Sequence, residues 1–310
     1  MLTASDRIQG ALYGLLVGDA LGVPYEFHGP ADIPALDRIE MTPPAGFHRA
    51  HGSVPPGTWS DDGAQALALL ASLLECGRLD VDDFGRRLVA WHERGYMAVD
   101  NRVFDVGIQT SQAIGALQRG VPASQAGPAG ERANGNGSLM RVLPLALWHQ
   151  GSDADLVTDA HVQSAVTHGH LRAQVCCALY CLWARRSLAG VADPWAEAVA
   201  ALRAIFSAGS PARAELDDVI RPDAPPAGSG SGYVVDCLNS ARLALAAGSY
   251  ERTVKAAIAL GNDTDTTACV AGGIAGVQQG LGAIPARWRD ALRGKEIVQP
   301  LVDQLLHRLS

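Results

Sequence analysis

The chain has 310 residues, of which 48% are hydrophobic and 18% are charged, and its formal net charge is −7. This composition is typical of a folded globular protein and excludes an intrinsically disordered one. No block of Lys or Arg is present, which argues against a nucleic-acid surface or a polybasic membrane patch, so we expect neither partner. No apolar stretch free of charges and helix breakers is long enough to span a membrane.

The start of the chain lacks the basic and apolar segments of a signal peptide. Most of the six cysteines lie within apolar helical patterns, where a free thiol behaves as a small hydrophobe. Cys177 and Cys181 are one helical turn apart, but no second Cys or His pair completes a zinc pattern. We therefore expect reduced cysteines in a cytoplasmic protein.

Helical periodicity dominates the sequence from its beginning to its end, and alternating strand patterns of useful length are missing. The helix around residues 8–16 has Ser5 or Asp6 as a candidate cap. Further helices are predicted at 64–76, 81–94, 108–119, 139–149, 171–188, 194–208, 233–247, 250–260, 265–280, 285–293 and 297–309. The predicted fold is all-α, a single domain over residues 1–310 built from many short helices.

Glycines recur every fourth residue at Gly10, Gly14 and Gly18, and again at Gly272 and Gly276. Glycine weakens a helix by about 1 kcal/mol relative to alanine, so close approach between two helices is the expected reason for this spacing. Three long irregular segments interrupt the helices, at 27–59, 122–137 and 207–232. Such segments are functional or mobile, and we interpret the last as a surface loop rather than a linker between domains.

Two acidic clusters each stand just before a predicted helix. The first contains Ser60, Asp61 and Asp62, and the second contains Asp263 and Asp265, with Thr266 beside them. Adjacent carboxylates repel one another unless a positive charge lies between them, and Mg²⁺ and Mn²⁺ prefer oxygen ligands of these types. Taken singly, each cluster could instead be a helix cap or an Asx-turn.

Other polar residues are weaker candidates. The segment 134–141 is a glycine-rich turn that enters a helix, where free N–H groups can bind phosphate or serve a structural role. His168 and His170 stand at the start of a helix and could contact a phosphate or a ribose. Asp19 lies at the end of an apolar helix, where its charge opposes the helix dipole and needs compensation nearby.

Several separated blocks together resemble the ADP-ribosylglycohydrolase family, which includes the dinitrogenase-reductase-activating glycohydrolase and the ADP-ribosylarginine hydrolases. The blocks follow family order over nearly the whole chain. They are residues 14–26, 59–62, 104–107, 136–141, 167–168, 232–235 and 261–266. Ser60 stands where many relatives have Thr, and it preserves the hydroxyl group.

The resemblance implies an orthogonal helical bundle with two divalent cations, Mg²⁺ or Mn²⁺, in a central cleft. The implied metal ligands are Ser60, Asp61, Asp62, Asp263, Asp265 and Thr266. The implied substrate-binding residues are Asn136, Gly137, Ser138, Met140, His168, Gly232 and Tyr233, with the glycine-rich block at the diphosphate and Tyr233 at the adenosine. Asp105 and Glu26 are the implied catalytic acid and base.

The resemblance also implies the activity, which is hydrolysis of the N-glycosidic bond between ADP-ribose and an arginine side chain of a modified protein, with ADP-ribose as the product. The blocks at 104–107 and 232–235 favour arginine over serine as the linkage. Alternatives are an O-linked ADP-ribose, another ribosylated compound, and a non-enzymatic crystallin-like protein on the same fold. A monomer is expected.

Overall fold

The computed structural model describes residues 2–309, and this part of the chain is helical and contains no β-strand. One isolated antiparallel bridge joins Gly135 to Tyr233. The α-helices are α1 (Ala4–Gly22), α2 (Asp61–Cys76), α3 (Val81–Arg94), α4 (Ile108–Gln118), α5 (Leu143–Trp148), α6 (Asp153–Ala165), α7 (Leu171–Leu188), α8 (Pro194–Ile205), α9 (Pro211–Ala214), α10 (Val234–Leu245), α11 (Tyr250–Ile258), α12 (Thr264–Gln279), α13 (Ala286–Ala291) and α14 (Lys295–Leu309). The predicted all-α fold is confirmed.

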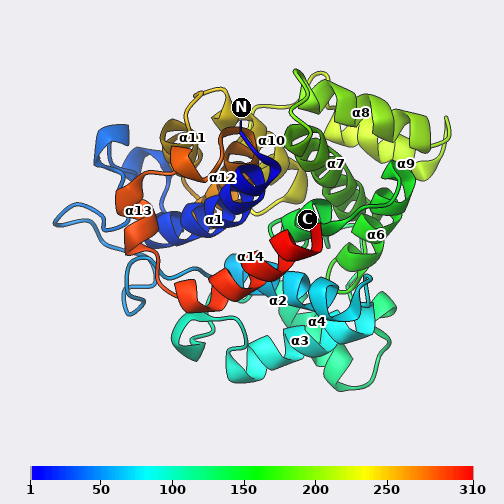
Figure 1. Cartoon of the computed structure of the whole chain (residues 1–310), viewed down its shortest axis with the longest axis horizontal. Helices are drawn as coiled ribbons and strands as arrows, with labels where there is room; N and C mark the ends of the chain where they lie inside the picture. The colour runs from blue at the N-terminus through cyan, green and yellow to red at the C-terminus, as the bar shows by residue number, and fades with distance from the viewer. Residues whose placement is uncertain (1, 310) are drawn as a thin grey trace.

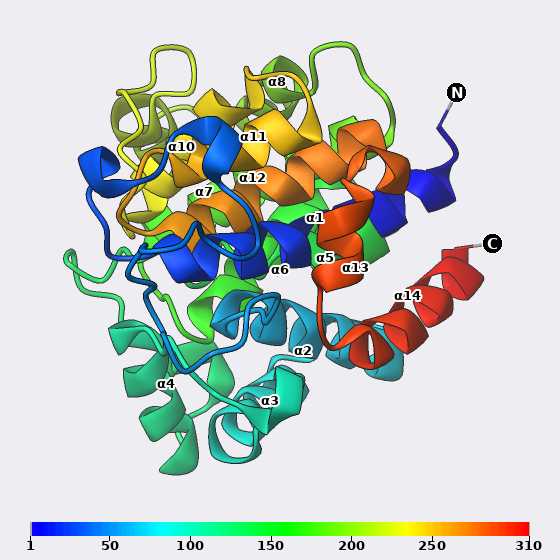
Figure 2. The ribbon, with the colours of Figure 1, turned by 90° about the vertical axis from the view of Figure 1, so that its left-hand side faces the viewer.

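Helices α1 and α12 pack side by side through the middle of the molecule, as Figures 1 and 2 show. Their glycines face one another, because a Cβ on Gly18 would lie 2.2 Å from the carbonyl oxygen of Ala268, and one on Gly14 would lie 2.4 Å from that of Gly272. The two backbones are therefore in direct contact. This confirms the expected reason for the four-residue glycine spacing.

The other helices form two groups around this central pair. Helices α10 and α11 pack on α12, and α7 contacts α5, α6, α8 and α10. Helices α2, α3 and α4 form the lower part of the molecule in Figure 2, with α14 along α2. None of the helices in residues 2–309 is both long and apolar enough to cross a bilayer.

Several local expectations were wrong. Helix α6 was not predicted, because its apolar residues are few and scattered, yet it begins with a capping box between Ser152 and Asp155. The predicted helix 139–149 shortens to α5, since Pro144 occupies its first turn. The expected surface loop 207–232 contains α9 and a π-helical turn, Glu215–Ile220. The cap of α1 is Thr3, which accepts a hydrogen bond from the backbone N–H of Asp6.

The segment that follows α1 folds back over the end of that helix. The hydroxyl of Tyr25 donates to the carbonyl oxygen of Glu40 at 2.8 Å, and the N–H of Ala50 donates to the carbonyl oxygen of Pro24 at 3.0 Å. Trp59 is buried at the end of the segment, and its indole N–H donates to the carbonyl oxygen of Met97. The fold therefore places residues near 50 beside residues 24–26.

Candidate active site

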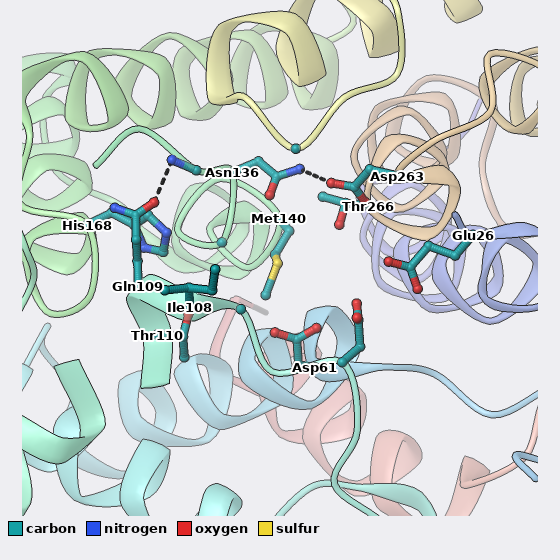
Figure 3. A pocket seen from close by; sticks show the side chains of 15 residues that line it. Glu26, Asp61, Ile108, Gln109, Thr110, Asn136, Met140, His168, Asp263 and Thr266 are labelled. Atoms are coloured by element: carbon teal, nitrogen blue, oxygen red, sulfur yellow. Dashed lines mark hydrogen bonds between the residues drawn. The ribbon is translucent and has the colours of Figure 1, made fainter. Parts of the chain in front are cut away.

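A cavity of about 250 Å³ opens where the N-termini of α2 and α12 meet the end of α1. We call it the central cavity. Figure 3 shows Glu26, Asp263 and Thr266 on one side of this space and Gln109 and His168 on the other, with Asp61 below and Asn136 reaching across to Asp263. Its lining residues are Glu26, Asp61, Asp105, Gly107, Ile108, Gln109, Thr110, Gly135, Asn136, Gly137, Met140, His168, Gly232, Asp263 and Thr266.

The first acidic cluster is built on the start of α2. Ser60 is the N-cap of that helix, and its hydroxyl accepts a hydrogen bond from the backbone N–H of Asp62 at 3.2 Å. Asp19 accepts hydrogen bonds from the backbone N–H groups of Ser60, at 2.9 Å, and Gly63, at 2.8 Å. The positive end of α2 thus compensates Asp19, as the sequence required. Asp61 remains free to face the central cavity.

The second cluster is built on the start of α12. Asp263 is the N-cap residue, and Asp265 and Thr266 lie in the first turn. A Cβ on Gly22 would lie 2.4 Å from Cα of Asp265. Because Gly22 has no side chain, the end of α1 can contact the first turn of α12 directly. The hydroxyl of Thr266 donates to Oδ1 of Asp62 at 3.3 Å. The two clusters therefore meet, although Asp62 and Thr266 are 204 residues apart in sequence.

The combined acid cluster fits divalent cations. One oxygen each of Glu26, Asp263 and Asp265 lies within 4.8 Å of the others. Oδ2 of Asp62 and Oδ2 of Asp265 are buried and have no hydrogen-bond partner. Unpartnered carboxylate oxygens in a protein interior are costly, and Mg²⁺ and Mn²⁺ are ligated by such oxygens. The donor set is therefore suited to hard cations.

Electrostatics lead to the same conclusion. Burial, together with the repulsion of neighbouring carboxylates, raises the pKa values of Asp61, Asp62 and Asp265 well above the usual range. Burial, followed by repulsion from Asp105, raises the pKa of Glu26 to about 10. Positive charge placed among these groups would reverse such shifts, because it stabilises the ionised form of each carboxyl group.

Glu26, a member of this acid cluster, shares a neighbour, His51, with Asp105. Nε2 of His51 lies 2.7 Å from Oε2 of Glu26 and 3.9 Å from Oδ1 of Asp105. Burial, followed by repulsion from Asp263, raises the pKa of Asp105 to about 6. One oxygen of each acid and one nitrogen of His51 lie within 4.8 Å of one another, so a proton can pass between them.

The glycine-rich turn forms the opposite wall of the central cavity. Nδ2 of Asn136 donates to Oδ2 of Asp263 at 2.8 Å, which ties the turn to the acid cluster. The ring of His168 packs beneath Gly137, where a Cβ would lie 2.8 Å from Cε1. Burial lowers the pKa of His168 to about 3, so the imidazole is a neutral hydrogen-bonding group at physiological pH.

Gln109 supports the same turn. Its Oε1 accepts a hydrogen bond from the backbone N–H of Gly135 at 2.7 Å, which fixes the orientation of the side-chain amide. Nε2 of Gln109 is buried and has no partner. The two N–H groups on that nitrogen are therefore available to an acceptor in the central cavity, such as a phosphate oxygen.

A buried arginine lies behind the first cluster. The guanidinium of Arg141 donates to Oε1 of Gln65 at 2.9 Å, and Nε2 of Gln65 donates to Oδ2 of Asp61 at 3.0 Å. Burial lowers the pKa of Arg141 to about 10, so it stays charged at neutral pH. Gln65 thus links a positive charge to Asp61 without placing that charge in the cavity.

The structure gathers most of the predicted site residues around one cavity, although not all of them line it. Ser60, Asp62 and Asp265 lie behind the surface formed by Asp61, Asp263 and Thr266. Ser138 is turned away from the cavity. Its fully buried hydroxyl accepts a hydrogen bond from the hydroxyl of Ser164 at 2.8 Å and also contacts the thiol of Cys177. Tyr233 stands outside the lining, 39% exposed, next to Gly232.

Sequence reasoning missed two parts of the site. Residues 107–110 line the central cavity because they follow Asp105 into α4, and the predicted helix start at Ile108 was the available signal. His51 lies in the irregular segment 27–59, where no sequence pattern indicates a partner for it. Only the folding back of the segment after α1 brings it to Glu26, so no local pattern could have shown this contact.

Comparisons with known proteins agree over the whole chain. The family profile described as ADP-ribosylglycohydrolase matches residues 2–310. The ADP-ribosylarginine hydrolase Tri1 of Pseudomonas putida strain GB-1 is 31% identical over 312 residues, which cover 98% of this chain and 79% of that protein. A solved structure of an ADP-ribosylglycohydrolase-related protein complex matches with a TM-score of 0.77 at 32% identity, over 97% of each chain.

More distant relatives carry related names. The ADP-ribosyl-dinitrogen-reductase glycohydrolase of Rhodospirillum rubrum is 28% identical, covering 97% of this chain and 96% of that protein. The ADP-ribosylhydrolase ARH3 of Homo sapiens is 26% identical, covering 98% of this chain and 93% of that protein.

Proposed function

The chain belongs to the ADP-ribosylglycohydrolase family and is a glycosidase-type hydrolase, and from this premise we propose that it releases ADP-ribose from arginine side chains of modified proteins. The bond cleaved is the N-glycosidic bond between the ribose and the guanidinium nitrogen. The observation that carries the proposal is the convergence of both acidic clusters and the glycine-rich turn on one cavity.

Two divalent cations, Mg²⁺ or Mn²⁺, are the proposed cofactors. The oxygens that would hold them belong to Ser60, Asp61, Asp62, Asp263, Asp265 and Thr266. Bound there, the cations would polarise the ribose hydroxyls and a water molecule. The unpartnered buried oxygens of Asp62 and Asp265 support this assignment, because without positive charge these groups are poorly satisfied.

The proton movements fall to Glu26 and Asp105. Hydrolysis needs one carboxylate to accept a proton as the water oxygen attacks the anomeric carbon, and an acid to protonate the departing guanidinium nitrogen as the C–N bond breaks. Both residues line the central cavity. The pKa of Asp105 is raised to about 6, so near neutral pH this group can either donate or accept a proton.

The other wall of the central cavity would bind the rest of ADP-ribose. Asn136, Gly137, Met140 and His168 line that wall and would lie along the diphosphate and ribose. No Lys or Arg is present among the described residues that line the central cavity. The diphosphate would therefore be held by backbone N–H groups and neutral side chains, with Nε2 of Gln109 as one donor. Gly232 and Tyr233 would lie at the adenosine end.

The test is ADP-ribose release from arginine-modified and serine-modified proteins, each with Mg²⁺, with Mn²⁺ and after exhaustive chelation. We expect release from the arginine-linked substrate, loss of activity with EDTA, and recovery when metal is restored. Release only from the serine-linked substrate would favour the O-linked alternative. Unchanged release after chelation would contradict the two-cation mechanism.

A further inference from the structure

A second cavity of about 500 Å³ adjoins the central cavity. We call it the outer cavity. The two cavities share Glu26, Gly232 and Asp263, so these three residues form the border between them. Phe27, Ser231 and Asn262 complete the outer cavity. A molecule bound across the border would therefore pass the carboxyl groups of Glu26 and Asp263.

Phe27 is held in an unusual position at this cavity. Its side chain is 71% exposed, and its backbone is left-handed with φ of 62°. Its N–H donates to the carbonyl oxygen of Asn262 at 2.7 Å, and the N–H of Asn262, itself left-handed with φ of 63°, donates to the carbonyl oxygen of His28 at 2.7 Å. Left-handed backbone is unfavourable for an aromatic residue, and such strained residues cluster at active sites and ligand-binding segments.

The exposed ring of Phe27 is not part of the hydrophobic core, but it has one aromatic neighbour. The ring of His51 lies 5.6 Å from that of Phe27, centroid to centroid. The structure thus fixes an aromatic ring at the surface, next to two acids, at a cost in backbone strain. A role in binding accounts for this arrangement, because the ring removes little apolar surface from water in the free protein.

Charge decides which kind of group would bind there. The outer cavity contains the carboxyl groups of Glu26 and Asp263, and among its described lining residues there is no Lys, Arg or His. Asp263 is among the proposed metal ligands, so Glu26 supplies the carboxyl group for a ligand in the outer cavity. An aromatic ring beside a carboxylate favours a planar cation. The guanidinium of arginine stacks on aromatic rings through its flat face and hydrogen-bonds to carboxylates through its edge.

We propose that the outer cavity receives the guanidinium group of the modified arginine and that Phe27 supplies the aromatic face on which it stacks. This inference rests on the proposed function. ADP-ribose would occupy the central cavity, the guanidinium would occupy the outer cavity, and the bond to be cleaved would lie at the border, beside Glu26. Phe27 is then a specificity-determining residue, since a serine linkage presents a neutral group that gains nothing from the ring.

The test compares Phe27→Leu, which keeps an apolar side chain without an aromatic face, with Phe27→Trp, which keeps the face. Leu36→Ala is the control, because Leu36 is also an exposed apolar residue after α1 and lines neither cavity. We expect Phe27→Leu to raise KM for the arginine-linked substrate by about 3- to 30-fold. Phe27→Trp and Leu36→Ala should keep KM near the wild-type value, and the Kd of ADP-ribose should stay within about twofold in all three variants.

A binding measurement separates this inference from the proposed function. N-methylguanidinium is titrated by NMR into wild-type protein and the Phe27→Leu variant, each saturated with ADP-ribose and Mg²⁺. Weaker binding to the variant supports the inference even if the arginine-linked substrate is not hydrolysed, an outcome that would sink only the proposed function. Equal binding of N-methylguanidinium to both proteins overturns the inference. A loss of ADP-ribose affinity in Phe27→Leu also overturns it, because that result would place the ring of Phe27 against the adenine.

Discussion

Nε2 of His51 lies 2.7 Å from Oε2 of Glu26, and this hydrogen bond joins the segment after α1 to the candidate catalytic acid. The imidazole has two aromatic neighbours, with ring centroids 5.1 Å away at Phe104 and 5.6 Å away at Phe27. Its backbone is left-handed, with φ of 48°. The imidazole ring is therefore positioned by two aromatic contacts, and it in turn positions the carboxyl group of Glu26.

His51 is expected to act as a positioning residue for Glu26. The variant His51→Phe keeps the aromatic packing but removes the hydrogen bond, so kcat should fall about 10-fold or more while KM changes little. His51→Gln restores a donor and should recover part of the loss. His48→Phe, at an exposed position on the same segment, is the control. Equal kcat values for His51→Phe and wild type would show that Glu26 needs no support from this ring.

Gln109 is expected to donate a hydrogen bond to bound ADP-ribose. In Gln109→Glu the side chain still accepts from the N–H of Gly135, but it can no longer donate and adds a negative charge. Loss of a hydrogen bond to a charged group corresponds to about 1.5–3 kcal/mol, so the Kd of ADP-ribose should rise about 10- to 100-fold in calorimetry. Gln112→Glu makes the same charge change at an exposed position of α4. A similar Kd for both variants would exclude a direct contact.

Metal-free protein should become less stable as pH rises from 7 to 8. The pKa of Glu26 in the folded state is about 10, above its usual value of 4.5, so the native state keeps a proton that the unfolded state has lost. Stability then falls with rising pH by about 1.4 kcal/mol per pH unit from this group. For a chain of this length the change corresponds to roughly 2 °C in Tm.

His161 and His168, whose pKa values are lowered by burial, change stability in the opposite direction, because their unfolded forms lose their remaining protons just above pH 7; this contribution is the same in wild type and in Glu26→Gln. Asp19, with a pKa raised to about 7, changes stability in the same direction as Glu26 in the lower part of the window. Calorimetry in EDTA should show a weaker pH dependence for Glu26→Gln than for wild type. Equal slopes for the two proteins would mean that Glu26 is ionised in the metal-free fold.

The backbone contact between α1 and α12 should be intolerant of a single methyl group. A Cβ on Gly18 would meet the carbonyl oxygen of Ala268 at 2.2 Å, and backbone cannot move aside cheaply. Overpacking of this kind costs about 1–3 kcal/mol, against about 1 kcal/mol gained in helix propensity. We expect Gly18→Ala to lower Tm and to weaken stabilisation by Mg²⁺, because the shift separates Glu26 from α12.

Gly130→Ala is the matched control for that substitution, since nothing lies within 4 Å of a Cβ built at Gly130. Its Tm should equal that of the wild type in thermal melts with and without Mg²⁺. If Gly18→Ala melts at the same temperature as this control, the two helices have more freedom than their contact indicates.

Local sequence was sufficient where a residue's role depends on its own neighbours. The helical periodicity predicted most of the helices, and the four-residue glycine spacing predicted a close helix pair, since both are properties of one segment. Helix α6 and the turns within 207–232 were missed because their apolar residues are too sparse for the pattern to be read. The family blocks identified the acidic clusters that line or support the central cavity.

Tertiary structure decided how those parts meet. Asp61 and Asp263 lie about 200 residues apart in sequence, and they face one cavity because α1 packs on α12 through its glycines and holds the start of α2 through Asp19. The tertiary structure also turns Ser138 away from the cavity, places Gln109 against Gly135, and brings His51 to Glu26. By itself, the sequence predicted the two acidic clusters and the glycine-rich turn as candidate site residues. Their distances and burial, and hence their pKa values and partners, come from contacts between segments that no local pattern encodes.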